Sequence, residues 1–205
     1  MNHKETIGED KKELILDSAK LIFAKYGYAK TTLEDIANVL GIKKNTLYYY
    51  FPGKEAIFNT VLSREAGLFW NEILEAVSKK KSASQKLYTI LVEGMQYARK
   101  RINLHDFASE AFLDVKHALT NSPTDFSERQ VDEISKIIDE GVKNGEFKKC
   151  NSAEIARCLI NFACSVEHRE IEKSKKEFLS EINFELIDNT IVPLLNLIIE
   201  GMKAK

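Results

Sequence analysis

The sequence predicts an all-α protein, and three observations support this. Only three prolines and nine glycines interrupt the 205 residues. Apolar residues recur through most of the chain at the spacing of one helix face. Near the amino end, a glycine at position 41 separates two short amphipathic segments. We therefore expect a three-helix domain over residues 1–54, followed by a larger helical domain over residues 55–205.

The first two helices are delimited by glycine and by a capping pattern. One helix is expected over residues 11–26, where apolar side chains share a face, and Gly27 ends it. The second begins after Thr32, which forms a variant of the capping box with Asp35. Gly41 ends this helix, because glycine enters the left-handed conformation without steric cost.

The third expected helix, over residues 43–51, crosses the second steeply because the turn between them is so short. The two form a helix-turn-helix motif at about residues 32–51. The exposed side of the third helix carries Lys43, Lys44, Asn45, Thr46, Tyr48, Tyr49 and Tyr50. Ammonium and hydroxyl groups bind phosphate oxygens, and an asparagine amide can pair with adenine in the major groove. A solvated surface with half-buried tyrosines is the alternative, but the glycine turn, the paired threonines and Lys54 favour DNA binding.

These residues resemble those of the TetR family of bacterial transcriptional regulators. The matching segments are 15–27, 31–37, 40–42 and 46–58. The resemblance implies a homodimer that binds a near-palindromic double-stranded DNA operator, usually as a repressor. It also implies that the C-terminal domain is an effector-binding and dimerisation domain, which senses a small molecule.

Individual DNA contacts follow from the resemblance by position. Thr31 and Thr32 would contact phosphates at the start of the second helix. Further phosphates would be held by Thr46, Tyr50 and Lys54. The residues that would face bases or the nearby DNA backbone are Lys44, Asn45, Tyr48 and Tyr49. Lys43 and Gly53 stand where the family often has capping residues, so both caps are expected to be weak.

Charge is divided unevenly along the chain. Residues 11–54 hold eight lysines against four acidic residues, a net charge of +4. Because the whole chain carries −1, the remainder carries −5. Local positive charge attracts phosphate, so nucleic acid is expected at the amino-terminal end only.

The rest of the chain predicts further helices and a dimer. The expected ranges are 54–79, 83–101, 104–119, 125–144, 152–173 and 178–202, with a kink at Pro193. The helix beginning at Lys54 is expected to belong to both domains. Apolar stripes on the last two helices suit either an ordinary core or a partner helix, and the family resemblance favours a four-helix dimer interface. Its expected residues are Ile155, Leu159, Phe162, Val166, Ile187, Leu194, Leu195 and Ile198.

A small, largely apolar effector is expected among the central helices. Its candidate contacts are Tyr88, Met95, Arg99, Phe107, Phe112, Ile134 and Phe162. A dry, packed core is the alternative for each of them. Arg99, His105, Glu110 and His117 are the polar groups expected to orient the molecule. No cofactor or metal is expected.

Several function classes are not supported by the sequence. It contains no Gly-rich phosphate loop, GxSxG, HExxH or metal-spaced Cys/His cluster, so an enzyme is not expected. No apolar run suggests a secretory signal or a membrane span, and the three cysteines are expected to be reduced in the bacterial cytoplasm. The remaining alternative is a DNA-binding regulator that is controlled by a partner protein, or an activator, without a small-molecule effector.

Overall fold

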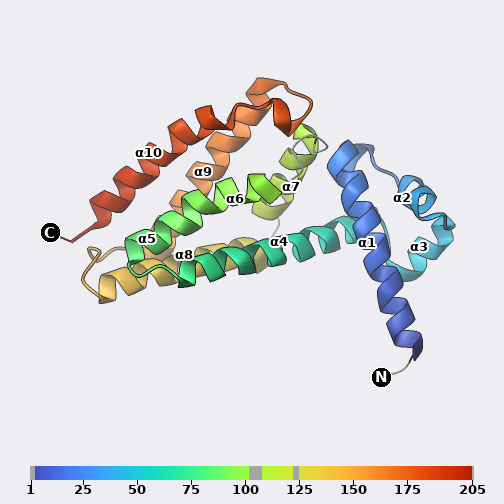
Figure 1. Cartoon of the computed structure of the whole chain (residues 1–205), viewed down its shortest axis with the longest axis horizontal. Coiled ribbons are helices and arrows are strands. Elements are labelled where there is room, and N and C mark those ends of the chain that lie inside the picture. Colours follow the sequence, from blue (N-terminus) through green and yellow to red (C-terminus); the bar gives the residue numbers. More distant parts are fainter. Residues whose placement is uncertain (1–2, 102–107, 122–124, 205) are drawn as a thin grey trace.

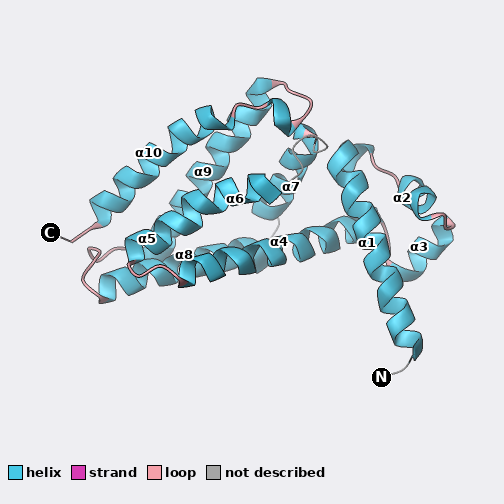
Figure 2. Ribbon diagram, viewed as in Figure 1, coloured by secondary structure: helices cyan, strands magenta, loops and turns pink. Residues whose placement is uncertain are grey.

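A computed structural model describes the backbone of residues 3–101, 108–121 and 125–204, and the side chains of residues 9–100, 108–115 and 128–204. All regular elements within these ranges are helical (Figure 2). They are α1 (His3–Lys30), α2 (Leu33–Leu40), α3 (Lys44–Tyr50), α4 (Lys54–Ser78), α5 (Ala83–Tyr88), the π-helix η1 (Thr89–Glu93), α6 (Gly94–Arg101), α7 (Ser109–Asn121), α8 (Asp125–Lys143), α9 (Ser152–Ser174), the 3-10 helix η2 (Leu179–Glu181) and α10 (Phe184–Met202). None of the described helices is long and apolar enough to cross a membrane.

The helices form two groups joined by α4. Figure 1 shows α1, α2 and α3 together at one end of the elongated molecule, and α4 running from them into the larger group. In that group α8 packs against α9 and α5, and α10 packs against α9 and α5. The α1–α3 group is also joined to the larger group by α7, which packs along α1.

Each group has its own hydrophobic core. The N-terminal core contains the buried faces of α1 and α2 with Leu47 and Phe51, and it continues into α4 through Ile57, Phe58 and Val61. The C-terminal core takes over further along the same helix, from Trp70. The N-terminal core therefore extends beyond the boundary expected at residue 54, because the first turns of α4 cover the bottom of the three-helix group.

Four of the described helices differ from their expected ranges, and one of them, α7, runs over Ser109–Asn121 where 104–119 was expected. α1 begins at His3, earlier than the apolar stripe that predicted it, and Gly27 interrupts it with φ 78° and ψ 167°. The helix expected over 83–101 contains a π-helical turn, Thr89–Glu93. The helix expected over 178–202 is divided, because the Asn183 side chain accepts hydrogen bonds from the N–H groups of Glu185 and Leu186 and so starts α10 anew. α10 then continues through Pro193.

Candidate functional site

The turn between α2 and α3 is held by local hydrogen bonds at both ends of α2. The Thr32 hydroxyl accepts from the Asp35 N–H at 3.2 Å, and the Asp35 carboxylate accepts from the Thr32 N–H at 2.8 Å. Hydrogen bonds from the Thr32 side chain and backbone lower the pKa of Asp35. At the other end Gly41 has φ 64°, and its N–H donates to the carbonyls of Ala37 and Asn38. The capping box predicted from sequence is therefore formed, and it fixes the direction in which α3 leaves the turn.

α3 presents its predicted polar side chains outward. Leu47 is fully buried and anchors the helix to the N-terminal core. Lys43, Asn45, Tyr48 and Tyr49 are exposed, and Tyr49 is 84% accessible. Lys44, Thr46 and Tyr50 are half-buried. The caps before α3 and α4 are weak, as expected, since neither Lys43 nor Gly53 forms a side-chain cap hydrogen bond.

One residue near α3 was not predicted from the sequence. Glu34, in the first turn of α2, forms an ion pair with Lys44, with 2.5 Å between Oε1 and Nζ. This hydrogen bond is the largest cause that lowers the pKa of Glu34 and raises the pKa of Lys44. Sequence reasoning missed the pair because the partners lie on different helices, and only the crossing of α2 and α3 brings them together.

Two predicted phosphate contacts have structural roles. Thr31 is only 1% exposed, and its hydroxyl donates to the Gly27 carbonyl at 2.7 Å. The Lys54 ammonium donates to the carbonyls of Tyr28 and Thr31, at 2.7 and 2.9 Å, and lies 4.2 Å from the Tyr28 ring centroid. Thr31 is thus inaccessible to DNA, and Lys54 neutralises the carboxyl end of α1. The expectation that Thr31 holds a phosphate is therefore wrong, whereas Lys54 is half-buried and its phosphate contact stays a prediction.

Other lysines of the N-terminal region are also paired within the chain. Lys20 contacts Glu65 of α4 at 2.6 Å, and Lys30 contacts Glu110 of α7 at 2.7 Å. The positive charge counted from the sequence is therefore partly neutralised by other helices. Lys43 stays exposed at the start of α3.

α7 forms a second attachment between the N-terminal group and the larger group. The Asp114 carboxylate accepts a hydrogen bond from the Tyr28 N–H at 3.0 Å, and the Ala108 N–H donates to the Ala24 carbonyl at 3.0 Å. A Cβ atom on Gly27 would lie 3.4 Å from the Asp114 Oδ2 atom. The kink in α1 therefore lets its last turn meet α7 closely.

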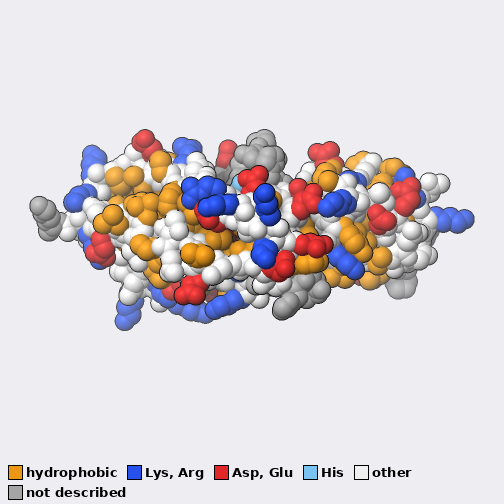
Figure 3. Space-filling model, turned by 90° about the horizontal axis from the view of Figure 1, so that it is seen from above, with side chains coloured by type: hydrophobic (Ala, Val, Ile, Leu, Met, Phe, Trp, Pro, Cys, Tyr) orange, Lys and Arg blue, Asp and Glu red, His pale blue; other side chains and the backbone are white. Residues whose placement is uncertain are grey.

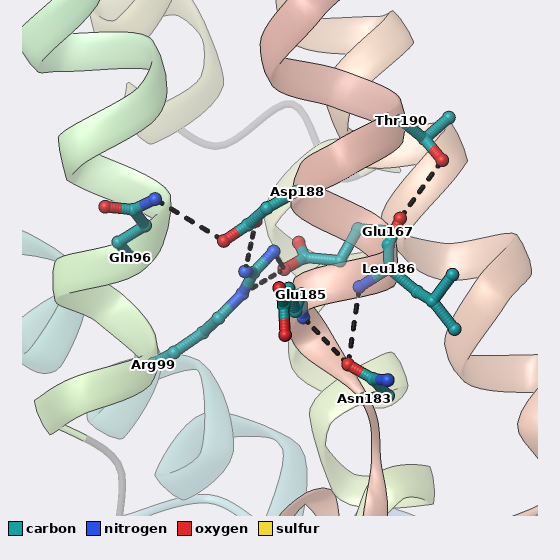
Figure 4. Close-up of polar contacts among 8 residues, drawn as sticks. All are labelled: Gln96, Arg99, Glu167, Asn183, Glu185, Leu186, Asp188 and Thr190. Carbon is teal, nitrogen blue, oxygen red and sulfur yellow. Dashed lines mark hydrogen bonds and ion pairs between the residues drawn. The ribbon is translucent and has the colours of Figure 1, made fainter.

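Among the predicted effector contacts that the structure describes, Tyr88 alone lines one of the two hollows described below. Arg99 is 5% exposed and pairs with Glu167 at 2.8 Å and with Asp188 at 2.6 Å (Figure 4). Its guanidinium also lies 4.5 Å from the Phe184 ring centroid, and Gln96 donates to Asp188. Arg99 therefore joins α6 to α9 and α10, and its charge is neutralised by the carboxylates of these two helices.

The remaining predicted effector contacts are divided between core and surface. Phe112 and Ile134 are buried in the C-terminal core, and Met95 and Phe162 pack against it. Tyr88 lines a hollow of about 330 Å³ between α5 and α10, and most of the other residues around it are polar or charged. A second hollow, of about 430 Å³, lies between α4 and α6 and is also lined mostly by polar or charged residues. Phe107, His105 and the side chain of His117 lie outside the described residues.

Most residues predicted at a dimer interface are inside the single chain. Leu159, Val166, Ile187 and Leu195 are buried in the C-terminal core, and Ile155, Phe162 and Ile198 pack against it. The four buried residues were misplaced, because an apolar stripe that faces other helices of the same chain looks the same in sequence as one that faces a partner. The three half-buried residues stay predictions of the dimer interface. Of the predicted set, Leu194 is exposed.

An outer apolar stripe of α10 remains at the surface. Leu186, Leu194 and Leu197 are 65%, 38% and 69% exposed and share one face of α10. Figure 3 shows apolar side chains gathered on the face of the molecule that α10 forms. We call these three residues the α10 leucine stripe. Only Leu194 of this stripe was selected from the sequence.

Comparison with known proteins identifies the N-terminal group. Residues 15–61 match the sequence profile of bacterial regulatory proteins of the tetR family, and this segment covers α2, α3 and the start of α4. In these residues the chain is similar to the TetR family.

Similarity to individual family members extends over most of the chain. The Biofilm operon icaADBC HTH-type negative transcriptional regulator IcaR of Staphylococcus aureus is 26% identical over 179 residues, covering 83% of this chain and 94% of the relative. The Fatty acid metabolism regulator protein of Bacillus subtilis is 24% identical over 146 residues, covering 71% of this chain and 75% of the relative. A transcriptional regulator from Cytophaga hutchinsonii has a crystal structure that matches with a TM-score of 0.67 and 26% identity, covering 95% of this chain and 99% of that one.

These relatives are transcriptional regulators and not enzymes, in agreement with the sequence-based expectation. In the part of the chain that the structure describes, His, Cys, Asp and Glu side chains form no cluster suited to a metal ion.

Proposed function

We propose that this TetR-family regulator binds a near-palindromic DNA operator as a homodimer, represses transcription there, and is released by a small effector. The observation that carries the proposal is the outward face of α3. Lys43, Asn45, Tyr48 and Tyr49 are exposed together on a helix whose orientation is set by a capping box and a glycine turn. These are the side chains that bind phosphate and base edges in a major groove.

The proposed contacts differ in what they recognise. Thr32, Lys43, Thr46 and Tyr50 lie at or beside the ends of α2 and α3 and are assigned to phosphates. Asn45, Tyr48 and Tyr49 are assigned to bases, with Lys44 beside them. Thr31 and Lys54 stabilise the motif through hydrogen bonds to backbone carbonyls at the end of α1 and just after it. The DNA-binding unit proposed here is residues 1–54 together with the first turns of α4, because they share one core.

The α10 leucine stripe is the proposed dimer contact, in combination with the outer face of α9. Large exposed apolar patches commonly mark interaction surfaces. A two-fold axis at this surface would hold two α3 helices at a set separation. Recognition of successive major grooves requires that separation to be about 34–36 Å or a multiple of it.

The proposed regulation follows from the two attachments of the DNA-binding unit. An effector bound among the helices of the larger group would shift α4, α7 or both, and so change the distance between the two α3 helices. The effector would then lower the affinity for DNA, and DNA would lower the affinity for the effector by the same factor. Repression is supported by the relative named a negative transcriptional regulator. A small apolar effector is supported by the relative named a fatty acid metabolism regulator.

Selection of binding sites from a random duplex pool tests the proposal directly. The purified wild-type protein should enrich a motif with two-fold symmetry, and it should sediment as a dimer at the same concentration. Saturated and unsaturated acyl compounds should then be added to the complex, and at least one class should release the operator. Failure to bind any duplex at about 50 mM salt, where phosphate contacts are strong, would contradict DNA binding. Release by a protein partner but by no acyl compound would favour the partner-controlled alternative.

A further inference from the structure

The ion pair between Glu34 and Lys44 lies beside the side chains proposed to enter the major groove. Glu34 is in the first turn of α2, Lys44 is the first residue of α3, and both side chains are partly exposed. The Lys44 ammonium also lies 6.0 Å from the ring centroid of Tyr48. The pair therefore presents a cation and an anion side by side at the outer edge of the helix-turn-helix motif.

A carboxylate in this position is unfavourable on DNA unless it finds a hydrogen-bond donor. The two lysines of α3 and its N-cap are balanced by Glu34 and Asp35 of α2, so this motif has no net charge between residues 32 and 51. Asp35 is engaged in the cap of α2. Glu34 is paired only with a side chain that would itself approach the DNA. On a phosphate-lined surface, Glu34 would be repelled.

Base edges in the major groove offer the missing donor. Guanine presents two acceptors there, O6 and N7, and cytosine presents the N4 amino donor. O6 and N4 are hydrogen-bonded to each other in the base pair, so they lie one hydrogen-bond length apart. The Lys44 Nζ and Glu34 Oε1 atoms are separated by a similar distance, 2.5 Å. The Lys44 ammonium can thus donate to guanine O6 while the neighbouring Glu34 carboxylate accepts from cytosine N4.

We propose that Glu34 and Lys44 together read one G·C base pair in each operator half-site. The Lys44 ammonium would donate to guanine O6 and N7, and the Glu34 carboxylate would accept from cytosine N4. An A·T pair fits less well, because the N6 donor of adenine stands between its two acceptors, adenine N7 and thymine O4, so the Lys44 ammonium can reach only one acceptor instead of the adjacent O6 and N7 of guanine. The pairing presupposes the DNA-binding function proposed above, and it assigns a base to that site.

The same pair would also disfavour binding to other sequences. On a duplex without a correctly placed cytosine, Lys44 exchanges the carboxylate for a phosphate and Glu34 faces the negatively charged backbone without a donor. On the operator, Glu34 gains the cytosine amino group. Glu34 would therefore be a specificity-determining residue, whose charge weakens sequence-independent binding more than operator binding.

Glu34→Ala is the decisive variant, and Glu55→Ala is its matched control. Glu55 is an exposed residue in the first turn of α4, so its removal changes the charge of the same domain equally but away from the pair. Sites should be selected from one random duplex pool with wild type and both variants. Wild type and Glu55→Ala should enrich the same motif with a G·C pair in each half-site. Glu34→Ala should lose about ten-fold of its discrimination at that position, in keeping with the energy of a base contact.

Two further measurements separate base recognition from a general charge effect. Affinity of Glu34→Ala for a random duplex should rise about two- to five-fold at low salt and return to the wild-type value at high salt. Lys44→Ala should relax the same base pair, and the double variant should relax it no further than either single variant. Circular dichroism should give unchanged helix content for all variants.

Distinct results would overturn the inference or the function on which it rests. A Glu34→Ala motif that keeps the G·C pair, or a wild-type motif without one, would overturn the role of the pair while leaving DNA binding intact. Failure of the wild type and every variant to bind any duplex would overturn both.

Discussion

The N-terminal group and the larger C-terminal group use their polar side chains in opposite ways. On α3, Lys43, Asn45 and Tyr49 are exposed and available to a ligand. In the C-terminal group Arg99, one of the polar groups expected to orient an effector, is enclosed by Glu167 and Asp188. The difference teaches that the exposure of a polar side chain can be predicted from sequence where local contacts fix its position. The partners of a polar side chain that faces other helices cannot be predicted in this way.

The physical cause is the range of the contacts. The capping box and the glycine turn of α2 join residues within a few positions of one another. The Arg99 cluster joins α6 to α9 and α10, over 68 and 89 positions. A buried charge must be paired, but the sequence does not reveal which distant carboxylates will reach it.

The largest expected effect tests whether the Arg99 cluster is structural. Arg99→Ala would leave Glu167, itself 2% exposed, as a buried charge without this partner. The free energy of unfolding should fall by about 3–5 kcal/mol, as for other broken buried pairs. Arg169→Ala is the control, because this exposed residue pairs only along its own helix and should change stability by about 1 kcal/mol or less. Urea unfolding measures both, and equal effects would contradict a structural role for Arg99.

A second prediction separates the two apolar faces of α10. Leu195 is fully buried, so Leu195→Ala should lower the free energy of unfolding by about 2–5 kcal/mol. Leu197 is 69% exposed on the α10 leucine stripe, so Leu197→Asp should leave the fold of the protomer intact but dissociate the dimer. Sedimentation at several concentrations should be combined with circular dichroism. An undiminished dimer of Leu197→Asp would place the interface elsewhere.

A third prediction concerns the attachment of α1 to α7. Gly27 has φ 78°, so Gly27→Ala places a side chain in an unfavourable backbone conformation, about 1–2 kcal/mol less stable. The new Cβ atom would lie 3.4 Å from the Asp114 Oδ2 atom, a van der Waals contact, so the cost comes from the backbone conformation. Gly67→Ala is the matched control, because Gly67 lies inside α4 with open space around it and should gain up to about 1 kcal/mol of helix stability. Thermal melting of both variants gives the signs, and a stabilised Gly27→Ala would rule out the strained junction.

A fourth prediction concerns DNA affinity. Lys43→Ala should weaken binding to all duplexes alike and reduce the slope of log K against log salt by about 1, as expected for one phosphate contact. Asn45→Ala should instead relax preference at particular bases, at a cost of about 1–3 kcal/mol. Titrations at several salt concentrations on operator and random duplexes compare them. If both variants changed the salt slope equally, the division between phosphate and base contacts on α3 would be wrong.

Much of the fold could be predicted because its signals are periodic or local. The helices from α2 to α4 and the last turns of α8 and α9 lie close to their expected limits. The π-helical turn at Thr89–Glu93 could not be predicted, since its hydrogen-bond shift depends on packing. The division before α10 had a local signal, Asn183, which is a preferred N-cap residue.

The candidate site was predicted in part. The exposed α3 residues lie where the amphipathic pattern placed them, and their DNA contacts stay predictions. Thr31 and Lys54 were assigned to phosphate because their positions match the family pattern, yet in the fold they cap α1. Glu34 was not selected, because a single exposed glutamate has no distinguishing sequence feature until Lys44 is placed beside it.

By itself, the sequence determined the helical class, the helix-turn-helix motif and the resemblance to the TetR family, since each depends on spacing and turn chemistry within short segments. Tertiary structure alone decided which face of α10 is buried, which lysines are neutralised and where Arg99 finds its carboxylates. The reason is that these outcomes depend on how helices far apart in the sequence cross, and helical periodicity shows that a face is apolar but not what covers it.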